Sequence, residues 1–229
     1  DLGWEVSSTG TGTTGIWVRA EPVGTFSGMT PVQPEYDRSE NDGTLCYFTG
    51  QGPPGGGIGV NDVDNGPVTL TSPVVEIAQQ QDVEVRFACW MYTASGTPDS
   101  LTVEFSRDGG SSWTSGATIT PTTGWEFHSV DLSGFPTVTG SQLRVRFTIS
   151  DIPSDSLTEA AIDEFRVVAT SCEPVPGDVN GDGIVNLRDM GILEDCLTGP
   201  LIPKSGNCSS SDTNDDSHID LLDAWVLFH

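Results

Sequence analysis

The sequence predicts a mainly β protein, in which an antiparallel β-sandwich of the jelly-roll type is followed by a small α-helical domain. Short segments of alternating polar and apolar residues recur between turns, in a chain of 229 residues with 27 Gly and 15 Pro. The chain also exceeds one ordinary domain of about 100–150 residues. After Thr170 the composition changes to a proline-bearing stretch and two acidic loops with helical patterns behind them. We therefore expect a sandwich at 1–170, a linker at 171–177 and a small domain at 178–229.

Three segments of the first domain alternate with a period of two, which is the pattern of a half-buried strand. Trp90 and Tyr92 are expected on the outer face of the first segment, and Arg144 and Arg146 on the outer face of the third, in contact with solvent. Further strands are predicted at 16–20, 45–49, 68–77, 117–120, 125–130 and 161–168, so that two sheets cover each other. The core-facing sets are Val83, Val85, Phe87, Cys89 and Met91; Leu101, Val103 and Phe105; and Leu143, Val145, Phe147 and Ile149.

The chain is strongly acidic, since 33 Asp and Glu against 9 Lys and Arg give a formal charge of −24. This charge repels phosphate backbones and anionic lipids, so neither nucleic acid nor membrane insertion is expected. No apolar run approaches the ~20 residues of a membrane span, and no leader precedes Asp1, so we expect a soluble chain. The five cysteines and three histidines match no zinc spacing. A disulfide between Cys196 and Cys208 would fit a secreted protein in an oxidising compartment.

A 12-residue acidic loop occurs twice, at 178–189 and, 34 residues later, at 212–223. Oxygen side chains stand at positions 1, 3, 5, 9 and 12, and position 7 offers a carbonyl, which is the ligand spacing of an EF-hand-type calcium loop. Glycine occupies the turn position of the first loop, and Ser217 replaces it in the second. The expected ligands of one Ca²⁺ are Asp178, Asn180, Asp182, the Ile184 carbonyl, Asn186 and Asp189. Those of the other are Asp212, Asn214, Asp216, the His218 carbonyl, Asp220 and Asp223.

Each loop is followed by apolar residues at helical spacing, and this duplicated unit resembles the type I dockerin family over 178–229. The resemblance implies a fold with two Ca²⁺ ions and a protein partner. Cellulosomal dockerins usually carry Ser-Thr-like pairs at loop positions 10 and 11 and a Lys-Arg pair late in the helix, and these face the cohesin. Here those places hold Leu187-Arg188 with Glu194-Asp195, and Leu221-Leu222 with Phe228-His229. A standard cellulosomal cohesin is therefore not the expected partner.

The predicted last helix is apolar around most of its surface, with Leu221, Leu222, Trp225, Val226, Leu227 and Phe228. Packing against the first repeat would bury only one apolar stripe of this helix, so we expect the sandwich or another subunit to cover its remaining apolar surface.

Residues Ser106–Trp113 fit the S-x-D-x-G-x-x-W pattern of the Asp boxes of sialidases. A single box predicts a β-hairpin turn, in which Asp108 accepts backbone N–H bonds, the glycines take positive φ and Trp113 packs beneath. Sialidase chemistry is not expected, because it needs several boxes and an arginine cluster.

The first domain as a whole resembles the β-sandwich modules that follow the catalytic domain in secreted bacterial zinc-carboxypeptidase-like proteins. This resemblance implies an ancillary module and not the peptidase, whose zinc ligands are absent. The residues that carry it are Gly15–Trp17, Glu21–Thr25, Gly43–Cys46, Thr49–Gly52, Asp62–Gly66, Leu70–Pro73 and Ala161–Phe165.

Asp163 shares a predicted strand face with Phe165 and Val167, which places its carboxylate at the edge of the core. A buried lone carboxylate is costly unless it is paired or binds a metal. In calcium-stabilised jelly rolls such an aspartate commonly meets acids of an earlier loop, and Asp62 with Asp64 are the candidates. We expect either a third Ca²⁺ at Asp62, Asp64 and Asp163 or turn-capping roles for these acids.

No Ser/His/Asp, Cys/His or paired-carboxylate constellation can be assembled, and His128 is expected to be a half-exposed strand residue, so the chain is predicted not to be an enzyme. The leading hypothesis is a secreted structural or adhesive protein that attaches or assembles outside the cell or at its surface. Self-association through the last helix, or through a sheet edge left incomplete near Asp1, would build a fibre. The alternatives are the targeting region of a larger secreted hydrolase, and a carbohydrate-binding module with Trp90 and Tyr92 as its platform. For these two residues, packing between sheets or at an interface is the favoured role.

Overall fold

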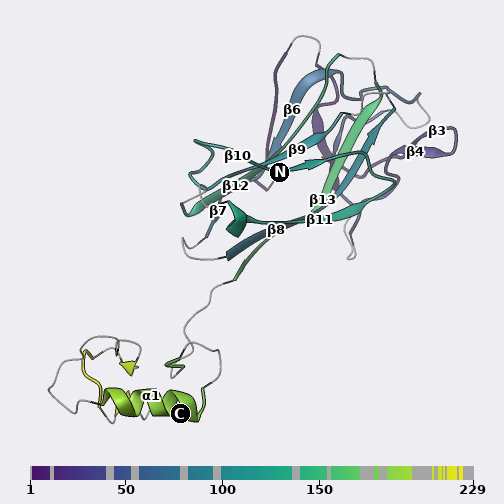
Figure 1. Ribbon diagram of the computed structural model, residues 1–229. Coiled ribbons are helices and arrows are strands. Elements are labelled where there is room, and N and C mark those ends of the chain that lie inside the picture. The colour runs from purple at the N-terminus through teal and green to yellow at the C-terminus, as the bar shows by residue number, and fades with distance from the viewer. Residues whose placement is uncertain are drawn as a thin grey trace. The chain divides into compact units, whose positions relative to one another are not determined.

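The computed structural model describes residues 2–10, 13–39, 44–52, 57–77, 82–94, 99–135, 140–153, 156–170, 178–180, 185–197, 208, 211–212, 214, 216–220 and 222–223. The chain divides into two compact units, Asp1–Ser171 and Cys172–His229, and each is described by itself (Figure 1). None of the helices in the described ranges is long and apolar enough to cross a membrane.

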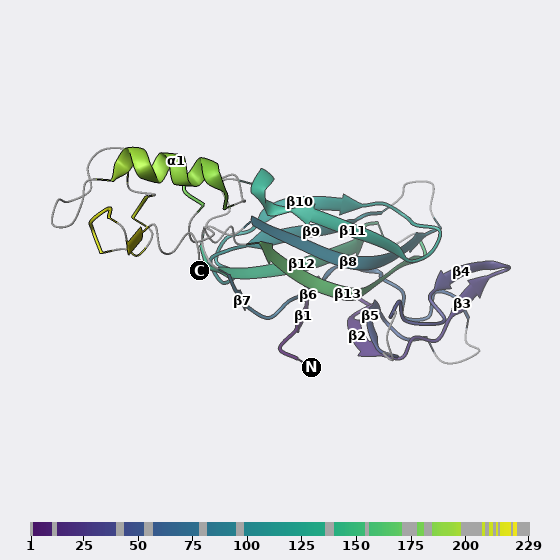
Figure 2. The same ribbon diagram turned by 90° about the horizontal axis from the view of Figure 1, so that it is seen from below.

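Two antiparallel sheets face each other in the first unit (Figures 1 and 2). One has the strand order β1-β6-β12-β9-β10, with β7 paired to β12, and the other has the order β11-β8-β13-β5-β2. A short hairpin of β3 and β4 forms a third, two-stranded sheet. The bounds are β1 Glu5–Ser8, β2 Trp17–Ala20, β3 Thr25–Ser27, β4 Thr30–Gln33, β5 Cys46–Thr49, β6 Asn65–Thr71, β7 Val75–Glu76, β8 Asp82–Thr93, β9 Leu101–Ser106, β10 Thr114–Ile119, β11 Glu126–Asp131, η1 Leu132–Gly134, β12 Gln142–Asp151 and β13 Thr158–Thr170. The predicted mainly β fold with an antiparallel sandwich is confirmed.

The core of the sandwich lies between the two sheets and is built from the alternating residues of β8, β9 and β12. Every core-facing residue predicted on these three strands is buried there. Phe87 and Phe147 meet edge to face across the core, with ring centroids 5.0 Å apart. The period-two pattern therefore placed the inner faces correctly.

The outer face of the five-stranded sheet carries a second, smaller core. Trp90 lies on that face, as predicted, but it is only 9% exposed, because β4 covers it and its indole Nε1 donates to the Val32 carbonyl over 2.8 Å. Cys46, Phe48 and Ala161 pack with it. An exposed platform of Trp90 and Tyr92 is therefore not formed.

A buried polar network attaches β4 to the sheet. The Gln33 side-chain amide donates to the carbonyls of Thr49 and Gly50 over 2.8 and 2.6 Å, and to the Glu159 carboxyl over 3.0 Å. The Thr49 hydroxyl donates to the same Glu159 oxygen over 2.6 Å. Glu159 is 3% exposed, and burial raises the pKa of its carboxyl well above the usual range. These bonds fix the hairpin, and with it the cover over Trp90.

The two arginines of β12 are half-buried and paired, although the sequence placed them in solvent. Arg144 donates to the Ser72 carbonyl over 2.9 Å and forms a 2.9 Å ion pair with Glu5 of β1. Arg146 donates to both carboxylate oxygens of Glu104 over 2.6 and 3.0 Å. Glu5 of β1 and Glu104 of β9 therefore pair with the two arginines on this face of the sheet.

The N-terminal segment belongs to the sandwich. β1 pairs with β6 along its whole length, from Glu5 opposite Thr71 to Ser8 opposite Val68. Just before it, the Trp4 ring lies 5.2 Å from Tyr47 and 5.0 Å from Phe165, measured between centroids. β1 is the outermost strand of this sheet, and the incomplete edge considered from the sequence stays a prediction.

The second unit contains α1, Leu187–Cys196, beside the two acidic loops. Leu193 and Ile219 are fully buried and pack with the Cys196–Cys208 disulfide, whose Cα atoms are 5.6 Å apart. Residues 224–229, which include most of the predicted apolar helix, lie outside the described residues, and its second cover stays a prediction.

Candidate functional site

The first acidic loop is closed by the aspartate at its twelfth position. Asp189 is fully buried, and its two carboxylate oxygens accept the backbone N–H groups of Asn180 over 3.1 Å and of Asn186 over 2.8 Å. These bonds, led by the one from Asn186, lower the pKa of Asp189. Asn186 in turn caps α1, since its side chain accepts from the Arg188 N–H over 2.9 Å. Asp182 and Ile184 of this loop lie outside the described residues.

The second loop repeats the same bonds 34 residues later. Asp223 is fully buried and accepts the N–H groups of Asn214 over 3.3 Å and of Asp220 over 2.8 Å. The Asp220 side chain accepts from the Leu222 N–H over 2.8 Å, as Asn186 does from Arg188. The duplication seen in the sequence is therefore also a duplication of hydrogen bonds.

The start of the second loop turns tightly around the first carboxylate. Asp212 accepts the N–H groups of Asp216 and Ser217 over 3.1 and 3.0 Å, and Asp216 accepts that of His218 over 2.9 Å. Ser217 has φ +71°, the left-handed conformation that a glycine adopts at this position. The backbone therefore takes the turn of a calcium loop although the glycine is missing.

The residues of the loops fit Ca²⁺ by their chemistry. Every predicted ligand is a carboxylate, an amide oxygen or a carbonyl, and calcium in proteins takes such hard oxygen donors. Two of the predicted ligands are the buried position-12 carboxylates Asp189 and Asp223. Within the described ranges, no group of three or more His, Cys, Asp or Glu side chains is arranged to hold a metal ion. The assignment of the twelve predicted ligands therefore stays a proposal.

The structure does not bring Asp62, Asp64 and Asp163 together. A β-bulge in β13 shifts the register between Asp163 and Arg166, with Glu164 at φ +50°. One extra residue reverses the faces of a strand, so Phe165 faces the core while Asp163 lies on the outer face, opposite Ala88. There its carboxylate accepts the N–H groups of Arg38 and Glu164 over 2.7 and 2.8 Å.

Asp62 belongs to another group of acids at the end of the sandwich. It is 6% exposed, and burial, followed by the charge of Asp64, raises its pKa to about 6. Asp151, which also acts on it, accepts from the Ser156 hydroxyl over 3.0 Å. Asp62, Asp64 and Asp163 therefore do not come together as the ligands of the predicted third Ca²⁺ site.

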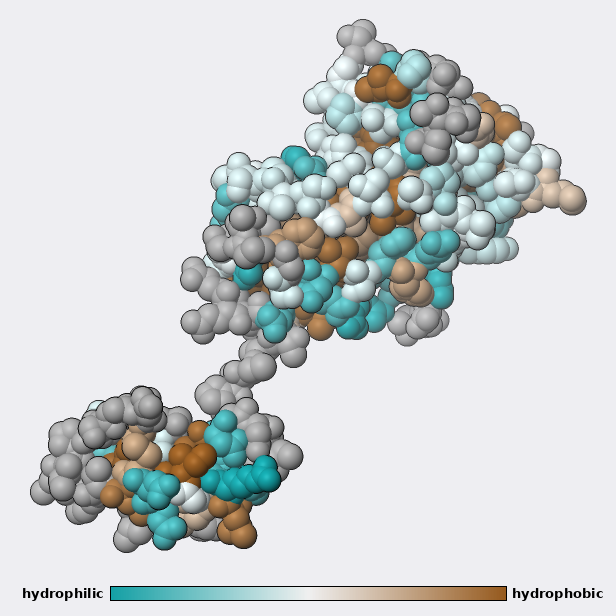
Figure 3. All heavy atoms as spheres, viewed as in Figure 1, coloured by the Kyte–Doolittle hydropathy of each residue, from teal (hydrophilic) through white to brown (hydrophobic). Residues whose placement is uncertain are grey.

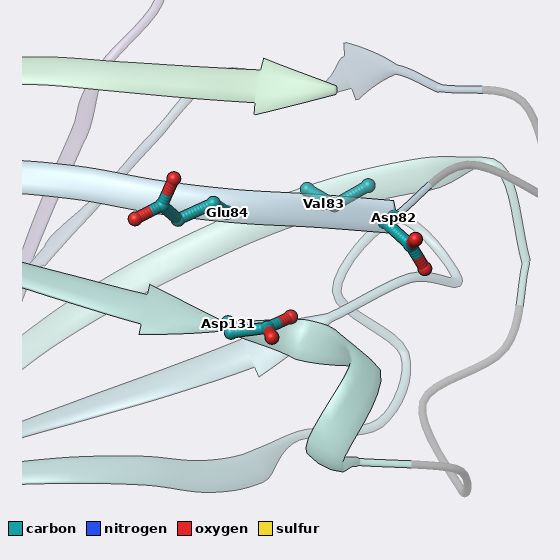
Figure 4. Close-up of a pocket in the computed structure, with 4 residues that line it drawn as sticks. All are labelled: Asp82, Val83, Glu84 and Asp131. Atoms are coloured by element: carbon teal, nitrogen blue, oxygen red, sulfur yellow. The ribbon is translucent and has the colours of Figure 1, made fainter. Parts of the chain in front are cut away.

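A hollow of about 320 Å³ lies at the ends of β8 and β11, where Asp82, Glu84 and Asp131 carry three carboxylates (Figure 4). Hydrogen bonds from Arg86, and then from Ser129, lower the pKa of Glu84, and Asp131 accepts the Ser133 N–H over 2.8 Å. These contacts are those of an exposed acidic surface.

The Asp box forms the turn that the sequence predicts. Asp108 accepts the Ser112 N–H over 2.9 Å and the Ser106 hydroxyl over 2.7 Å, and Gly109 and Gly110 have φ +74° and +101°. The Trp113 indole donates to the Gly110 carbonyl over 3.0 Å. The motif is therefore a β9–β10 hairpin turn.

The candidate nucleophiles of the sandwich are in unreactive surroundings. Cys46 and Cys89 are buried, and burial raises the pKa of both thiols. His128 is half-buried, as predicted; it stacks on Phe87 with centroids 5.4 Å apart, and its Nε2 has no hydrogen-bond partner.

Known families and solved structures are similar to parts of this chain. Residues 176–228 match the family model of the dockerin type I domain. No curated protein matches the chain. Among solved structures, the K1 cleaved adhesin domain of Lys-gingipain from Porphyromonas gingivalis W83 is similar, with 14% identity, 75% of this chain and 93% of that chain covered, and a TM-score of 0.47. The family 11 carbohydrate-binding module of cellulosomal cellulase Lic26A-Cel5E from Clostridium thermocellum has 9% identity, coverage of 74% and 89%, and a TM-score of 0.42.

The C-terminal part of the chain is therefore similar to dockerins, which supports the resemblance seen in the sequence. The likeness of the sandwich to solved structures is too low to carry an argument about function. Its resemblance to modules of zinc-carboxypeptidase-like proteins stays a prediction.

Proposed function

We propose that this chain is a non-catalytic, secreted calcium-binding protein that attaches to a protein partner outside the cell through its C-terminal unit. The observation that carries the proposal is the repeated hydrogen-bond pattern of the two loops, together with the dockerin match over 176–228. In each loop a buried aspartate accepts two backbone N–H groups, and these bonds join the end of the loop to its earlier residues. Two Ca²⁺ ions would be held by the predicted ligand sets.

Two of the partner-facing positions carry exposed leucines in this chain. Leu187 and Leu222, at position 10 of the first loop and position 11 of the second, are 83% and 61% exposed. Among the coloured residues of this unit, hydrophobic and hydrophilic ones lie side by side on the face seen in Figure 3. Exposed apolar residues beside polar ones are common at sites of protein association. We therefore infer a partner with an apolar contact surface, in place of the cohesin that recognises Ser-Thr-like pairs.

The test is calcium binding by the full chain. Native mass spectrometry should show two bound Ca²⁺ ions, and Asp178→Ala or Asp212→Ala should each remove one. Because the ligands come together around the ion, binding contributes to folding, and chelation should make the C-terminal unit sensitive to protease.

The matched control is Asp195→Ala, which removes the same charge from an exposed position of α1. It should leave both ions in place. Protease resistance of the C-terminal unit that does not change in excess chelator would contradict the proposal. Light scattering with and without chelator then distinguishes a monomer that binds a partner from calcium-dependent self-assembly into a fibre.

A further inference from the structure

A pocket of about 400 Å³ lies between the β3–β4 hairpin and the outer face of the five-stranded sheet. Phe26 of β3 and Tyr36, just after β4, line it on the hairpin side, and Trp90 and Trp125 line it on the sheet side. Phe26 and Tyr36 are 51% and 75% exposed, which is unusual for aromatic rings of a folded domain. Aromatic residues from three separate parts of the chain therefore surround one cavity.

The two tryptophans of the pocket are held in fixed positions. The Trp90 indole N–H donates to the Val32 carbonyl over 2.8 Å, and that of Trp125 donates to the Tyr36 carbonyl over 3.1 Å. Their rings meet edge to face with centroids 6.2 Å apart. Both indole donors are thus used inside the protein, and only the apolar parts of the rings remain for a ligand.

The charged groups that line the pocket are hydrogen-bond acceptors. They are the carboxylates of Glu35 and Asp37, and one oxygen of Glu35 accepts the Gly24 N–H over 3.0 Å. Asp37 has a buried oxygen, Oδ2, with no hydrogen-bond partner in the described structure. Apart from the Tyr36 hydroxyl, the described lining offers no side-chain donor that is not already engaged.

Further negative charge lies beside the pocket. Asp37 is near Asp163, whose carboxylate is placed on this face by the bulge of β13, and the charge of Asp37 adds to burial in raising the pKa of Asp163. The nearby Arg38 guanidinium lies over the Phe127 ring, 4.8 Å from its centroid. The carboxylates of Glu35, Asp37 and Asp163 outnumber the Arg38 guanidinium here, and this balance of charge favours a cation.

We propose that this pocket binds a lysine or arginine side chain of a partner protein. Such a side chain has an alkyl stem for the aromatic rings and a cationic end that only donates hydrogen bonds, which complements carboxylates that only accept them. A sugar presents hydroxyls that need both donors and acceptors, so it fits this lining less well. The proposal concerns the sandwich alone and does not depend on the calcium loops.

The test is a titration of the full chain, in excess chelator and again in calcium, with three blocked pentapeptides. They carry a central lysine, arginine or norleucine between glycines, and the readout is the NMR signal of the Trp125 indole N–H, assigned with Trp125→Phe. The lysine and arginine peptides should shift this signal in a saturable manner at about millimolar concentration, and the norleucine peptide should not. Asp37→Asn should weaken binding about tenfold, and Phe26→Ala should weaken it about threefold.

The matched control is Asp82→Asn, which removes the same charge at the start of β8, in the hollow of Figure 4. It should bind the lysine peptide as the unchanged chain does. Phe26→Ala keeps the test valid if Asp37→Asn fails to fold, because the Phe26 ring is half-exposed. The proposal is overturned if the norleucine peptide binds equally well, or if Asp82→Asn weakens binding as much as Asp37→Asn. It is also overturned if cellohexaose or Ca²⁺, titrated in the same way, shifts the Trp125 signal while the lysine and arginine peptides do not.

Discussion

Replacing Trp4 by alanine should destabilise the whole sandwich, because this ring packs between the two sheets from a segment that is otherwise exposed. Its centroid lies 5.2 Å from Tyr47, 5.0 Å from Phe165 and 6.4 Å from Phe147. Loss of a buried tryptophan costs about 3–5 kcal/mol, and aromatic pairs at such distances contribute about 0.5–1.5 kcal/mol each. Since Trp4 is half-buried, we expect a loss of about 3 kcal/mol in the free energy of unfolding.

Thermal unfolding of the full chain, followed by near-ultraviolet circular dichroism, measures this loss. For a unit of this size, 3 kcal/mol corresponds to a decrease in Tm of about 6–12 °C. The control is Trp113→Ala in the Asp-box turn, whose ring contacts the Arg146 guanidinium at 4.3 Å on the surface, and it should lower Tm by about a third as much. If Trp4→Ala changes Tm no more than Trp113→Ala, then the N-terminal segment with β1 is not part of the cooperative sandwich.

Three further predictions concern the core, the pH dependence and the disulfide. Gly116→Ala should lower the free energy of unfolding by about 3 kcal/mol or more, because the new Cβ would lie 1.8 Å from a ring carbon of the buried Phe105. Gly124→Ala is the control and should be neutral, because a Cβ there would have nothing within 4 Å, and urea unfolding measures both variants. Burial lowers the pKa of His128 in the folded chain, so protonation favours the unfolded chain, and stability is lost as pH falls below about 6.5 and through the lowered folded-state pKa. The unchanged chain should therefore lose more stability than His128→Phe between about pH 8 and 5, and parallel urea midpoints would refute the assignment. Reducing the disulfide of the C-terminal unit, which spans 12 residues, should destabilise that unit by about 3 kcal/mol, measured as faster proteolysis in calcium.

The inner faces of the sandwich could be predicted because they depend only on a local period. In β8, β9 and β12 every second residue is apolar, and one sheet covers the other, so the alternation determined which residues are buried. The short strands β1, β3 and β4 were missed, because they have three or four residues and no alternation. Their effects were missed with them: β4 buries Trp90, and β1 supplies the Glu5 partner of Arg144.

The error at Asp163 has a different origin. A strand face is assigned by counting residues, and the count is valid only while the register is regular. The bulge after Asp163 adds one residue, so Asp163 and Phe165 lie on opposite faces although they are two apart in the sequence. No residue type in the segment indicates a bulge in advance, since Glu164, which takes the positive φ, is not a glycine. The carboxylate that was expected near Asp62 is found beside Asp37 for this reason.

The two acidic loops are the opposite case, because the repeat of residue spacing seen in the sequence is matched by a repeat of backbone hydrogen bonds in the structure. EF-hand loops have a glutamate at position 12 that reaches the ion with both oxygens. Both loops here have an aspartate, one methylene shorter, and in the structure it accepts N–H groups from positions 3 and 9 of its own loop. Each carboxylate still has lone pairs for an ion, because an ionised carboxylate has about four acceptor sites. The shorter side chain therefore joins position 12 directly to the backbone at positions 3 and 9. Both loops keep these backbone bonds, although Ser217 replaces a glycine at the sixth position of the second loop.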